Sequence, residues 1–275
     1  MPELPEVETT KKELKSLIIN KFIDKVLIYT KFLRIPLEEA KLKKLEGKKI
    51  ISITRKAKYI IIKLNNFYSI IIHLGMTGRL LSRHFDKPRN KHDHLVLRIK
   101  KGCDIVFNDV RKFGFIAVDL QNNLQNNKFL KNLGVEPLSK NFSSLFLEKI
   151  LKKSSAPIKS VLLNQKLISG IGNIYACESL FDSGILPQTP SNKIKKKKIT
   201  ILCKSIKKIL KRAIKSKGSS INSFKLPSGE LGTFQNNFTV YGREGNFCLK
   251  SNCYNKIKRI KIAGRSTFYC SSCQN

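Results

Sequence analysis

Six short apolar runs between residues 50 and 118 place the strongest constraint on how this chain can fold. They cover residues 50–53, 59–64, 69–72, 95–99, 105–107 and 115–118, and are rich in β-branched and aromatic side chains. Turn signals such as Asn65-Asn66 and Lys101-Gly102 lie between them. Many short β-type runs at this spacing are typical of an antiparallel sandwich. We therefore expect an antiparallel β-sandwich in the first half of the chain.

Helical patterns flank these runs. Residues 5–19 predict a helix that leads into the sandwich, which would place the N-terminus at the sandwich edge. From about Gly134 the β pattern ends, and residues 145–151 and 158–163 continue in a helical pattern. Residues 194–217 predict an amphipathic helix that stops at Gly218. Its apolar face would consist of Ile199, Leu202, Ile206, Ile209, Ala213 and Ile214.

The chain is strongly basic. Its 54 Lys and Arg against 19 Asp and Glu give a net charge of +35 over 275 residues, which predicts binding to a polyanion. The alternative is the Lys-rich composition of an AT-rich genome. Residues 151–275 carry 24 of the basic residues and 4 of the acidic ones, so this half is the more favoured polyanion surface. No signal peptide pattern or apolar run long enough for a bilayer is present, which predicts a cytoplasmic protein.

Four cysteines gather near the C-terminus in the pattern Cys248-x4-Cys253-x16-Cys270-x2-Cys273. Two pairs of thiolates separated by about a hairpin suit tetrahedral zinc, and a reducing compartment disfavours disulfides. The alternative is four unlinked thiols. A ribbon this short has few apolar residues, so we expect bound metal to supply most of its folding free energy. The remaining cysteines, Cys103, Cys177 and Cys203, are isolated.

The first residues carry unusual chemistry. If Met1 is removed, Pro2 becomes a terminal secondary amine that is partly neutral near physiological pH and can attack a sugar carbon to form an imine. Glu3 follows directly and can move protons. An ordinary helix start is the alternative, and it accounts for Pro5 and Glu6 but not for Pro2 and Glu3.

Two loops carry side chains that are uncommon in solvated turns. One is 73–79, with Met76 between glycines, and the other is 108–114, with Arg111 and Phe113 at its tip. Apolar and Arg wedges of this kind enter base stacks when proteins kink DNA, whereas the alternative is a pair of half-buried hairpin turns. His-x-His at residues 92–94 lacks a third ligand nearby, which argues against metal there.

A glycine-rich segment opens a helix at residues 170–176, Gly-Ile-Gly-Asn-Ile-Tyr-Ala. Such a segment suits phosphate, because glycine lets the backbone approach and the helix N-terminus offers N–H groups. Asn173 is expected to be the N-cap of this helix.

The opening Met-Pro-Glu-Leu-Pro-Glu-Val-Glu-Thr closely resembles that of bacterial formamidopyrimidine-DNA glycosylases, which excise oxidised purines from DNA. The resemblance continues through Ala-Lys-Tyr at 57–59, both loops, Lys-His-Asp-His at 91–94, and the helix–two-turn–helix signature at 170–181. It departs in the ribbon, where the family has Cys-x2-Cys and this chain has Cys248-x4-Cys253.

The resemblance implies a role for each candidate residue. Pro2 would be the nucleophile and Glu3 the acid/base, assisted by Lys58 and the ribbon residue Arg265. Met76, Arg111 and Phe113 would fill the space of the flipped base. The phosphate-binding set would be His92, Arg111, Asn173, Arg265 and one lysine among Lys152, Lys153 and Lys159, with Lys153 taken as the candidate.

The sequence therefore predicts an α+β fold in three domains: a β-sandwich catalytic domain with a leading helix (1–133), a helix–two-turn–helix domain (134–232) and a zinc ribbon (238–275). The resemblance implies a monomeric, cytoplasmic, nucleoid-associated DNA glycosylase/AP lyase with one structural zinc, acting on double-stranded DNA that contains 8-oxoguanine or formamidopyrimidines. The loop 219–232 would cover the flipped base. The alternatives are an endonuclease VIII-type pyrimidine glycosylase, which typically opens Pro-Glu-Gly-Pro, and a damage-binding protein without catalysis.

Overall fold

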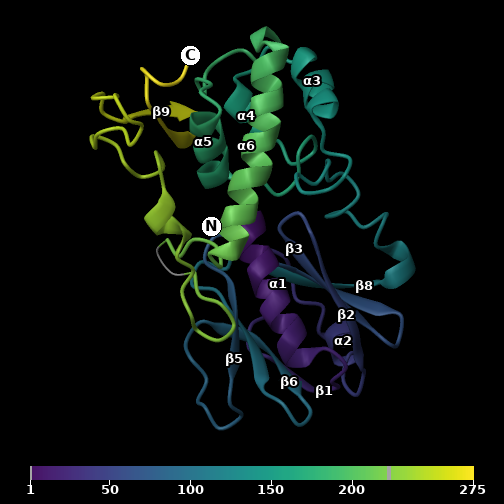
Figure 1. The fold of residues 1–275 in the computed structure, drawn as a ribbon. Helices are drawn as coiled ribbons and strands as arrows, with labels where there is room; N and C mark the ends of the chain where they lie inside the picture. Colours follow the sequence, from purple (N-terminus) through teal and green to yellow (C-terminus); the bar gives the residue numbers. More distant parts are fainter. Residues whose placement is uncertain (1, 222–223) are drawn as a thin grey trace. The chain divides into compact units, whose positions relative to one another are not determined.

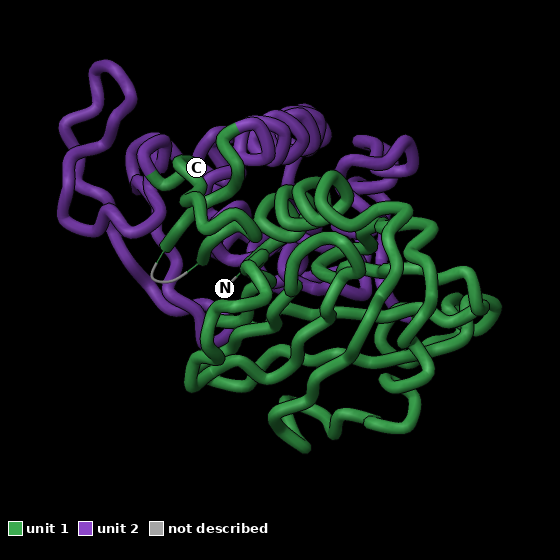
Figure 2. Tube along the Cα trace, turned by 90° about the horizontal axis from the view of Figure 1, so that it is seen from below, with its two compact units in different colours: residues 1–131, 216–235 green, residues 132–215, 236–275 purple. Residues whose placement is uncertain are grey.

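The structure is a computed structural model that describes residues 2–221 and 224–275. The chain forms two compact units (Figure 2): unit 1 is Met1–Lys131 with Ser216–Gln235, and unit 2 is Asn132–Lys215 with Asn236–Asn275. The three-domain division stays a prediction. Within the described residues, no helix has both the length and the apolar character needed to cross a membrane.

Unit 1 is built from a leading helix and antiparallel strands (Figure 1). The predicted helix at 5–19 is α1 (Leu4–Ile18), and every predicted strand is present. The further elements are α2 (Glu39–Lys43), β1 (Ile23–Ile28), β2 (Ile50–Lys56), β3 (Tyr59–Leu64), β4 (Tyr68–His73), β5 (Arg79–Arg83), β6 (Asp93–Ile99), β7 (Asp104–Asn108), β8 (Phe115–Leu120) and η1 (Gln121–Asn123).

The described strands of unit 1 form two antiparallel sheets, in the orders β1-β6-β7-β5 and β2-β3-β4-β8. Apolar side chains from both sheets meet in one core, for example Ile72 of β4 and Phe107 of β7, which confirms the predicted sandwich. Val7 and Leu14 on the buried face of α1 belong to the same core. Leu226 of the returning segment packs there as well, which is why 216–235 lies in unit 1.

The sequence did not predict β1 and β5. Both are edge strands of their sheet, and both carry charges: Asp24 and Lys25 are exposed on β1, while Arg79 and Arg83 are the first and last residues of β5. Edge strands are often charged because this discourages pairing with other chains, and the charges interrupt the apolar pattern on which strand prediction depends.

Unit 2 is helical, with a hairpin near its C-terminus. The helix predicted at 194–217 is α6 (Lys196–Lys215), which packs against α3 and α5. Gly218 follows with a φ of 79°, as expected for a helix stop. The other elements are α3 (Ser144–Lys152), α4 (Ile158–Leu163), α5 (Asn173–Asp182), η2 (Ser191–Lys193), β9 (Lys258–Ile262) and β10 (Arg265–Tyr269), and η3 (Phe234–Asn237) begins in unit 1 and ends in unit 2.

The sandwich core predicts unequal costs for the same substitution at two sites. Ile72 is 1% exposed inside the core, whereas Ile51 is 46% exposed on β2. Ile72→Ala should lower the free energy of unfolding by about 2–5 kcal/mol, because it removes buried methylene groups and leaves a cavity. Ile51→Ala, the control, should cost about 1 kcal/mol or less. Urea unfolding followed by circular dichroism measures both, and equal costs would contradict the packing described.

Candidate functional site

The start of α1 holds the two candidate catalytic residues. Glu3 is the N-cap, and its backbone N–H donates to Glu6 Oε2 at 2.9 Å. The Glu3 carboxylate accepts from the Glu6 backbone in return, which completes a capping box. Pro2 is buried and Glu3 is 2% exposed. The helix start therefore fixes a carboxylate directly after the proline in a site with little access to solvent.

Glu6 is a residue whose role the sequence did not reveal. Its carboxylate is 1% exposed, and Oε1 accepts from the Ser219 backbone N–H at 2.7 Å and from the Ser219 hydroxyl at 3.1 Å. A side chain at Gly218 would collide with Glu6. One buried carboxylate thus joins Glu3 to the first residue of the loop 219–232. Residues 222 and 223 of that loop, which was predicted to cover the base, lie outside the described residues.

Lys58 occupies the tight turn between β2 and β3. Ala57 adopts the left-handed conformation there, with a φ of 54°. Arg55 fixes the turn to α1, because its Nη1 donates to the Ala57 carbonyl at 2.9 Å and its Nε to Glu8 Oε2 at 2.8 Å. Burial raises the pKa of Glu8, but hydrogen bonds from Lys11 and Arg55 outweigh burial and hold this pKa below its usual range. Lys58 is 6% exposed, unlike an ordinary surface lysine.

The sandwich topology brings the two predicted loops together. Because β4 pairs with β8 and β5 with β7, the loops 73–79 and 108–114 leave neighbouring strands and cross between the same two sheets. Met76 and Phe113 are 41% and 42% exposed at the loop tips. The Arg111 guanidinium is also exposed and lies 4.5 Å from the centre of the Phe113 ring. The three candidate wedge residues therefore lie on adjacent loops with exposed side chains.

His73 lies at the base of the first loop and carries no charge at neutral pH. Its Nδ1 accepts from the Gly75 backbone N–H at 3.1 Å, so the ring proton is on Nε2. Burial first, and then the positive charges of Lys58 and Arg34, lower the pKa of His73 to about 4. The ring also stacks on Phe115 with the centroids 5.5 Å apart. A neutral imidazole thus supports the loop without adding positive charge near Lys58.

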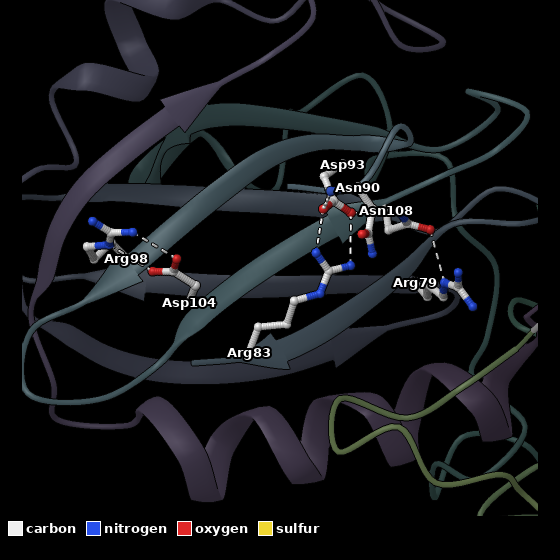
Figure 3. A network of polar contacts seen from close by, with 7 residues as sticks. All are labelled: Arg79, Arg83, Asn90, Asp93, Arg98, Asp104 and Asn108. Carbon is white, nitrogen blue, oxygen red and sulfur yellow. Dashed lines mark hydrogen bonds and ion pairs between the residues drawn. The ribbon is translucent and has the colours of Figure 1, made fainter. Parts of the chain in front are cut away.

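A polar network holds the turn that carries His92 (Figure 3). Asp93 is 1% exposed and accepts from Arg83 at 2.5 and 3.1 Å, from the Asn90 backbone N–H at 2.7 Å and from Asn108 Nδ2 at 2.7 Å. Burial raises the pKa of Asp93, but these hydrogen bonds outweigh it and the pKa lies below its usual range. The carboxylate joins β5, β7 and the turn, and half-buried His92 precedes it directly.

The predicted N-cap at Asn173 is wrong by one residue. Gly172 is the N-cap of α5, and Asn173 is the first helical residue. The Asn173 side chain does not cap the helix, because its Nδ2 donates to the Ser266 carbonyl at 2.9 Å. Among the described residues Asn173 Oδ1 is buried without a hydrogen-bond partner. A phosphate contact by Asn173 stays a prediction.

The structure separates the lysines that were considered for phosphate contact. Lys159 is fully buried, and its Nζ donates to the Ser266 carbonyl at 3.1 Å and to Thr267 Oγ1 at 2.5 Å. Its ammonium group therefore holds β10 and is not available to a surface phosphate. Lys152 is engaged in an ion pair on α3. Lys153, at the C-cap of α3, is exposed and stays the candidate.

The four predicted cysteine ligands come together. Their Sγ atoms all lie within 4.8 Å of one another, with Cys248 and Cys273 at 3.8 Å and Cys253 and Cys270 at 3.6 Å. A tetrahedron with Zn–S bonds of about 2.3 Å needs sulfur separations of about 3.8 Å. A hydrogen bond from the Asn255 backbone is the first cause that lowers the pKa of Cys253 to about 7. The group fits one structural zinc, and the wider Cys248-x4-Cys253 spacing does not prevent it.

The ribbon has more apolar packing than the sequence suggested. Val240, Ile257 and Phe268 pack with Cys177 and Phe181 of α5 in a small core. This apolar packing also contributes to the folding free energy of the ribbon. The expectation that metal supplies most of that free energy did not include this packing.

The buried carboxylate of Glu178 on α5 fixes the backbone at the start of the ribbon. Glu178 accepts from the backbone N–H groups of Thr239 at 2.9 Å, Val240 at 3.0 Å and Tyr241 at 2.8 Å. Arg265 is the first residue of β10 and is exposed, and its contact with a phosphate stays a prediction.

Known proteins match this chain in both of its units. Residues 1–116 match the formamidopyrimidine-DNA glycosylase N-terminal domain, and residues 133–225 match the H2TH domain of the same enzymes. The chain is 44% identical to the formamidopyrimidine-DNA glycosylase of Zymomonas mobilis subsp. mobilis over 276 residues, with 100% of both chains covered. The chain belongs to the formamidopyrimidine-DNA glycosylase family.

Other members of the glycosylase family agree in sequence and in fold. The formamidopyrimidine-DNA glycosylase of Wolbachia sp. subsp. Drosophila simulans is 42% identical, with both chains covered completely. A crystal structure of Lactococcus lactis Fpg with DNA containing an abasic site has a TM-score of 0.91 at 36% identity over 100% of both chains. A complex of a Lactococcus lactis Fpg mutant with Fapy-dG DNA gives the same TM-score at 38% identity, again over 100% of both chains.

The buried, neutral His73 predicts a pH dependence of stability. In the unfolded chain His73 takes up a proton near pH 6.5, but in the folded chain only near pH 4. The unfolded state therefore binds more protons between these values, and stability should fall as the pH drops from about 6.5 to about 4, by up to about 1.4 kcal/mol per pH unit. Urea unfolding at several pH values measures this dependence. The His73→Gln variant should lack the fall in stability that protonation of His73 causes. His84→Gln, an exposed control with a side chain 74% accessible, should retain it.

The cysteine cluster predicts selective loss of metal. Cys253→Ser should lose zinc and loosen the ribbon, because a hydroxyl replaces one of four thiolates. Cys103→Ser, which lies outside the cluster, should keep about one zinc per chain. Metal analysis together with DNA titration measures both. Purified wild-type protein that cleaves DNA normally without zinc would contradict the assignment.

Proposed function

We infer that this chain is a bifunctional DNA glycosylase and AP lyase that removes oxidised purines, such as 8-oxoguanine and formamidopyrimidines, from double-stranded DNA. The observation that carries the inference is its membership of the formamidopyrimidine-DNA glycosylase family along its whole length, with Pro2 and Glu3 at a buried helix start. Solved relatives are complexes with Fapy-dG DNA and with abasic DNA, which are a substrate and an intermediate of this activity.

The chemistry begins with a flipped nucleotide, because the sugar carbon is out of reach inside the stack. After removal of Met1, the Pro2 nitrogen forms a bond to C1′ while the glycosidic bond breaks, and the base leaves with that electron pair and receives a proton. Glu3 supplies and accepts protons as the amine becomes an imine with the opened sugar. Loss of the C2′ proton then breaks the C3′–O bond, and a second elimination breaks the C5′–O bond. Lys58 and Arg265 assist these eliminations.

The wedge and the phosphate contacts hold the DNA in this state. Met76, Arg111 and Phe113 fill the space that the flipped base leaves. The residues that bind phosphates are His92, Lys153, Asn173, Arg111 and Arg265. The cysteine cluster holds a structural zinc, which when bound keeps the hairpin of β9 and β10 folded. The enzyme acts as a monomer on the nucleoid in the cytoplasm.

A pyrimidine substrate has one specific observation in its favour. Wild-type Lactococcus lactis Fpg has been solved with DNA that contains an oxidised pyrimidine, at a TM-score of 0.90 to this chain. Leu4 and the Met76, Arg111 and Phe113 set nevertheless favour purine lesions, because the endonuclease VIII type typically has Gly after Pro-Glu and lacks this wedge. Release of 8-oxoguanine opposite cytosine should therefore be faster than release of thymine glycol.

Borohydride trapping tests the proposal. Wild-type protein incubated with a duplex containing 8-oxoguanine opposite cytosine should give a covalent adduct, and mass spectrometry should map it to Pro2. A variant with one residue placed before Pro2 should give none, because its terminal amine is no longer that of proline. Lys12→Ala, an exposed position on the same helix, should react like the wild type. An adduct that maps to Lys58 would contradict the role of Pro2, and faster release of thymine glycol would contradict the substrate.

A further inference from the structure

Asp109 lies between the two loops that carry Met76, Arg111 and Phe113. It follows β7 directly and is 0% exposed. Its carboxylate accepts from Thr77 Oγ1 at 2.5 Å in the loop between β4 and β5. It also accepts from the Gly114 backbone N–H at 2.8 Å in its own loop, and it shares the Arg111 backbone N–H with Thr77 Oγ1, each at 3.2 Å. One carboxylate thus bonds to both loops.

The backbone of Asp109 also connects these two loops to the turn that carries His92. Its N–H donates to the His92 carbonyl at 3.1 Å. Its carbonyl oxygen lies 2.8 Å from Nε2 of His94, which is itself buried. The residue therefore joins three functional segments of unit 1 through its own atoms.

Close backbone packing makes the two loops depend on this link. A Cβ atom at Gly75 would collide with the backbone of Phe113 and Gly114, and a Cβ atom at Gly114 would lie 2.7 Å from the His73 carbonyl oxygen. At Gly75 and Gly114 the backbones of the two loops are therefore in direct contact. Neither glycine contributes a side chain to apolar packing. Hydrogen bonds therefore hold these backbones in contact, and a charged acceptor makes stronger bonds than a neutral one.

We propose that Asp109 is the positioning residue of the wedge, a buried carboxylate that holds the loops of Met76 and of Arg111 and Phe113 as one rigid body. This inference rests on the proposed function, because it assumes that these three side chains enter the base stack. A buried carboxylate is stable only with its donors in place, so separation of the loops would leave a charge without its partners. The three side chains then enter DNA together rather than one at a time.

The same contacts leave the Arg111 side chain available. The carboxylate binds the Arg111 backbone N–H, while the guanidinium lies over the Phe113 ring and is exposed. Asp109 therefore fixes the backbone position from which the Arg111 side chain projects. It does not neutralise the charge of the Arg111 guanidinium. A guanidinium held at a fixed point can bond the edge of the base opposite the lesion, so Asp109 should also affect the choice of that base.

The test compares Asp109→Asn and Thr77→Val with Thr77→Ser and Val110→Ala. The side chain of Asn at position 109 would have one acceptor oxygen, and its NH2 group would face a hydrogen-bond donor instead of accepting from it. Val at position 77 removes the hydroxyl of the other loop and keeps nearly the same shape. Ser at 77 restores that hydroxyl. Val110 is 52% exposed in the same loop and serves as the matched control.

We expect single-turnover release of 8-oxoguanine from duplex DNA to fall about tenfold or more in Asp109→Asn and in Thr77→Val, as for loss of a hydrogen bond to a charged group. Preference for cytosine opposite the lesion should weaken in both. Strand cleavage at an abasic site in single-stranded DNA, which needs no wedge, should stay within about twofold of wild type. Thr77→Ser and Val110→Ala should behave like wild type, and the Thr77→Val/Asp109→Asn double variant should lose less than the two single losses combined.

Two results would overturn the inference. One is unchanged duplex excision in both Asp109→Asn and Thr77→Val while the wild type is active. The other is equal loss on duplex and single-stranded DNA in Thr77→Val, which would indicate a general effect on the fold. Failure of the proposed function is distinguishable from both, because the wild-type protein itself would then release no 8-oxoguanine.

Discussion

A buried carboxylate must be surrounded by hydrogen-bond donors, and this requirement organises the functional parts of the molecule. Removing a charge from water is costly unless donors replace the lost hydration. Glu6 accepts from the backbone N–H groups of Glu3 and Ser219, and Glu178 accepts from those of three consecutive residues at the start of the ribbon. Asp93 accepts in the same way from the Asn90 N–H before His92, and Asp109 accepts from the Gly114 N–H in the loop 108–114. Each acid fixes the backbone of the segment whose N–H groups it accepts.

This use of acids also shapes the surface. The chain has 19 Asp and Glu against 54 Lys and Arg, and several of the acids act as internal acceptors. Most lysines, by contrast, are exposed, so the surface that a polyanion would contact is mainly positive. Lys159 differs from these, because its buried ammonium finds oxygen acceptors on β10 instead of a phosphate.

The sandwich supplies the frame on which these contacts act. Its strand order places the loops of Met76 and Phe113 next to each other, and α1 packs against β2, which leads to Lys58. The apolar core of the two sheets is close-packed, and the hydrogen bonds of Asp93 and Asp109 connect the neighbouring loops to its strand ends.

Local patterns in the chain were enough to predict the helix at the start, the strands of the sandwich interior, the amphipathic α6 and the four cysteines, because hydrophobic period and ligand spacing are local properties. They were also enough for the family, through motifs that stand in order along the chain. Three-dimensional packing was needed to show that β1 and β5 complete a sheet as charged edge strands, that Gly172 rather than Asn173 caps α5, and that Lys159 is buried. It was also needed to assign partners to Glu6, Asp93, Asp109 and Glu178. The physical reason is that the cost of burying a polar group depends on donors and acceptors distant in sequence, which no local pattern records.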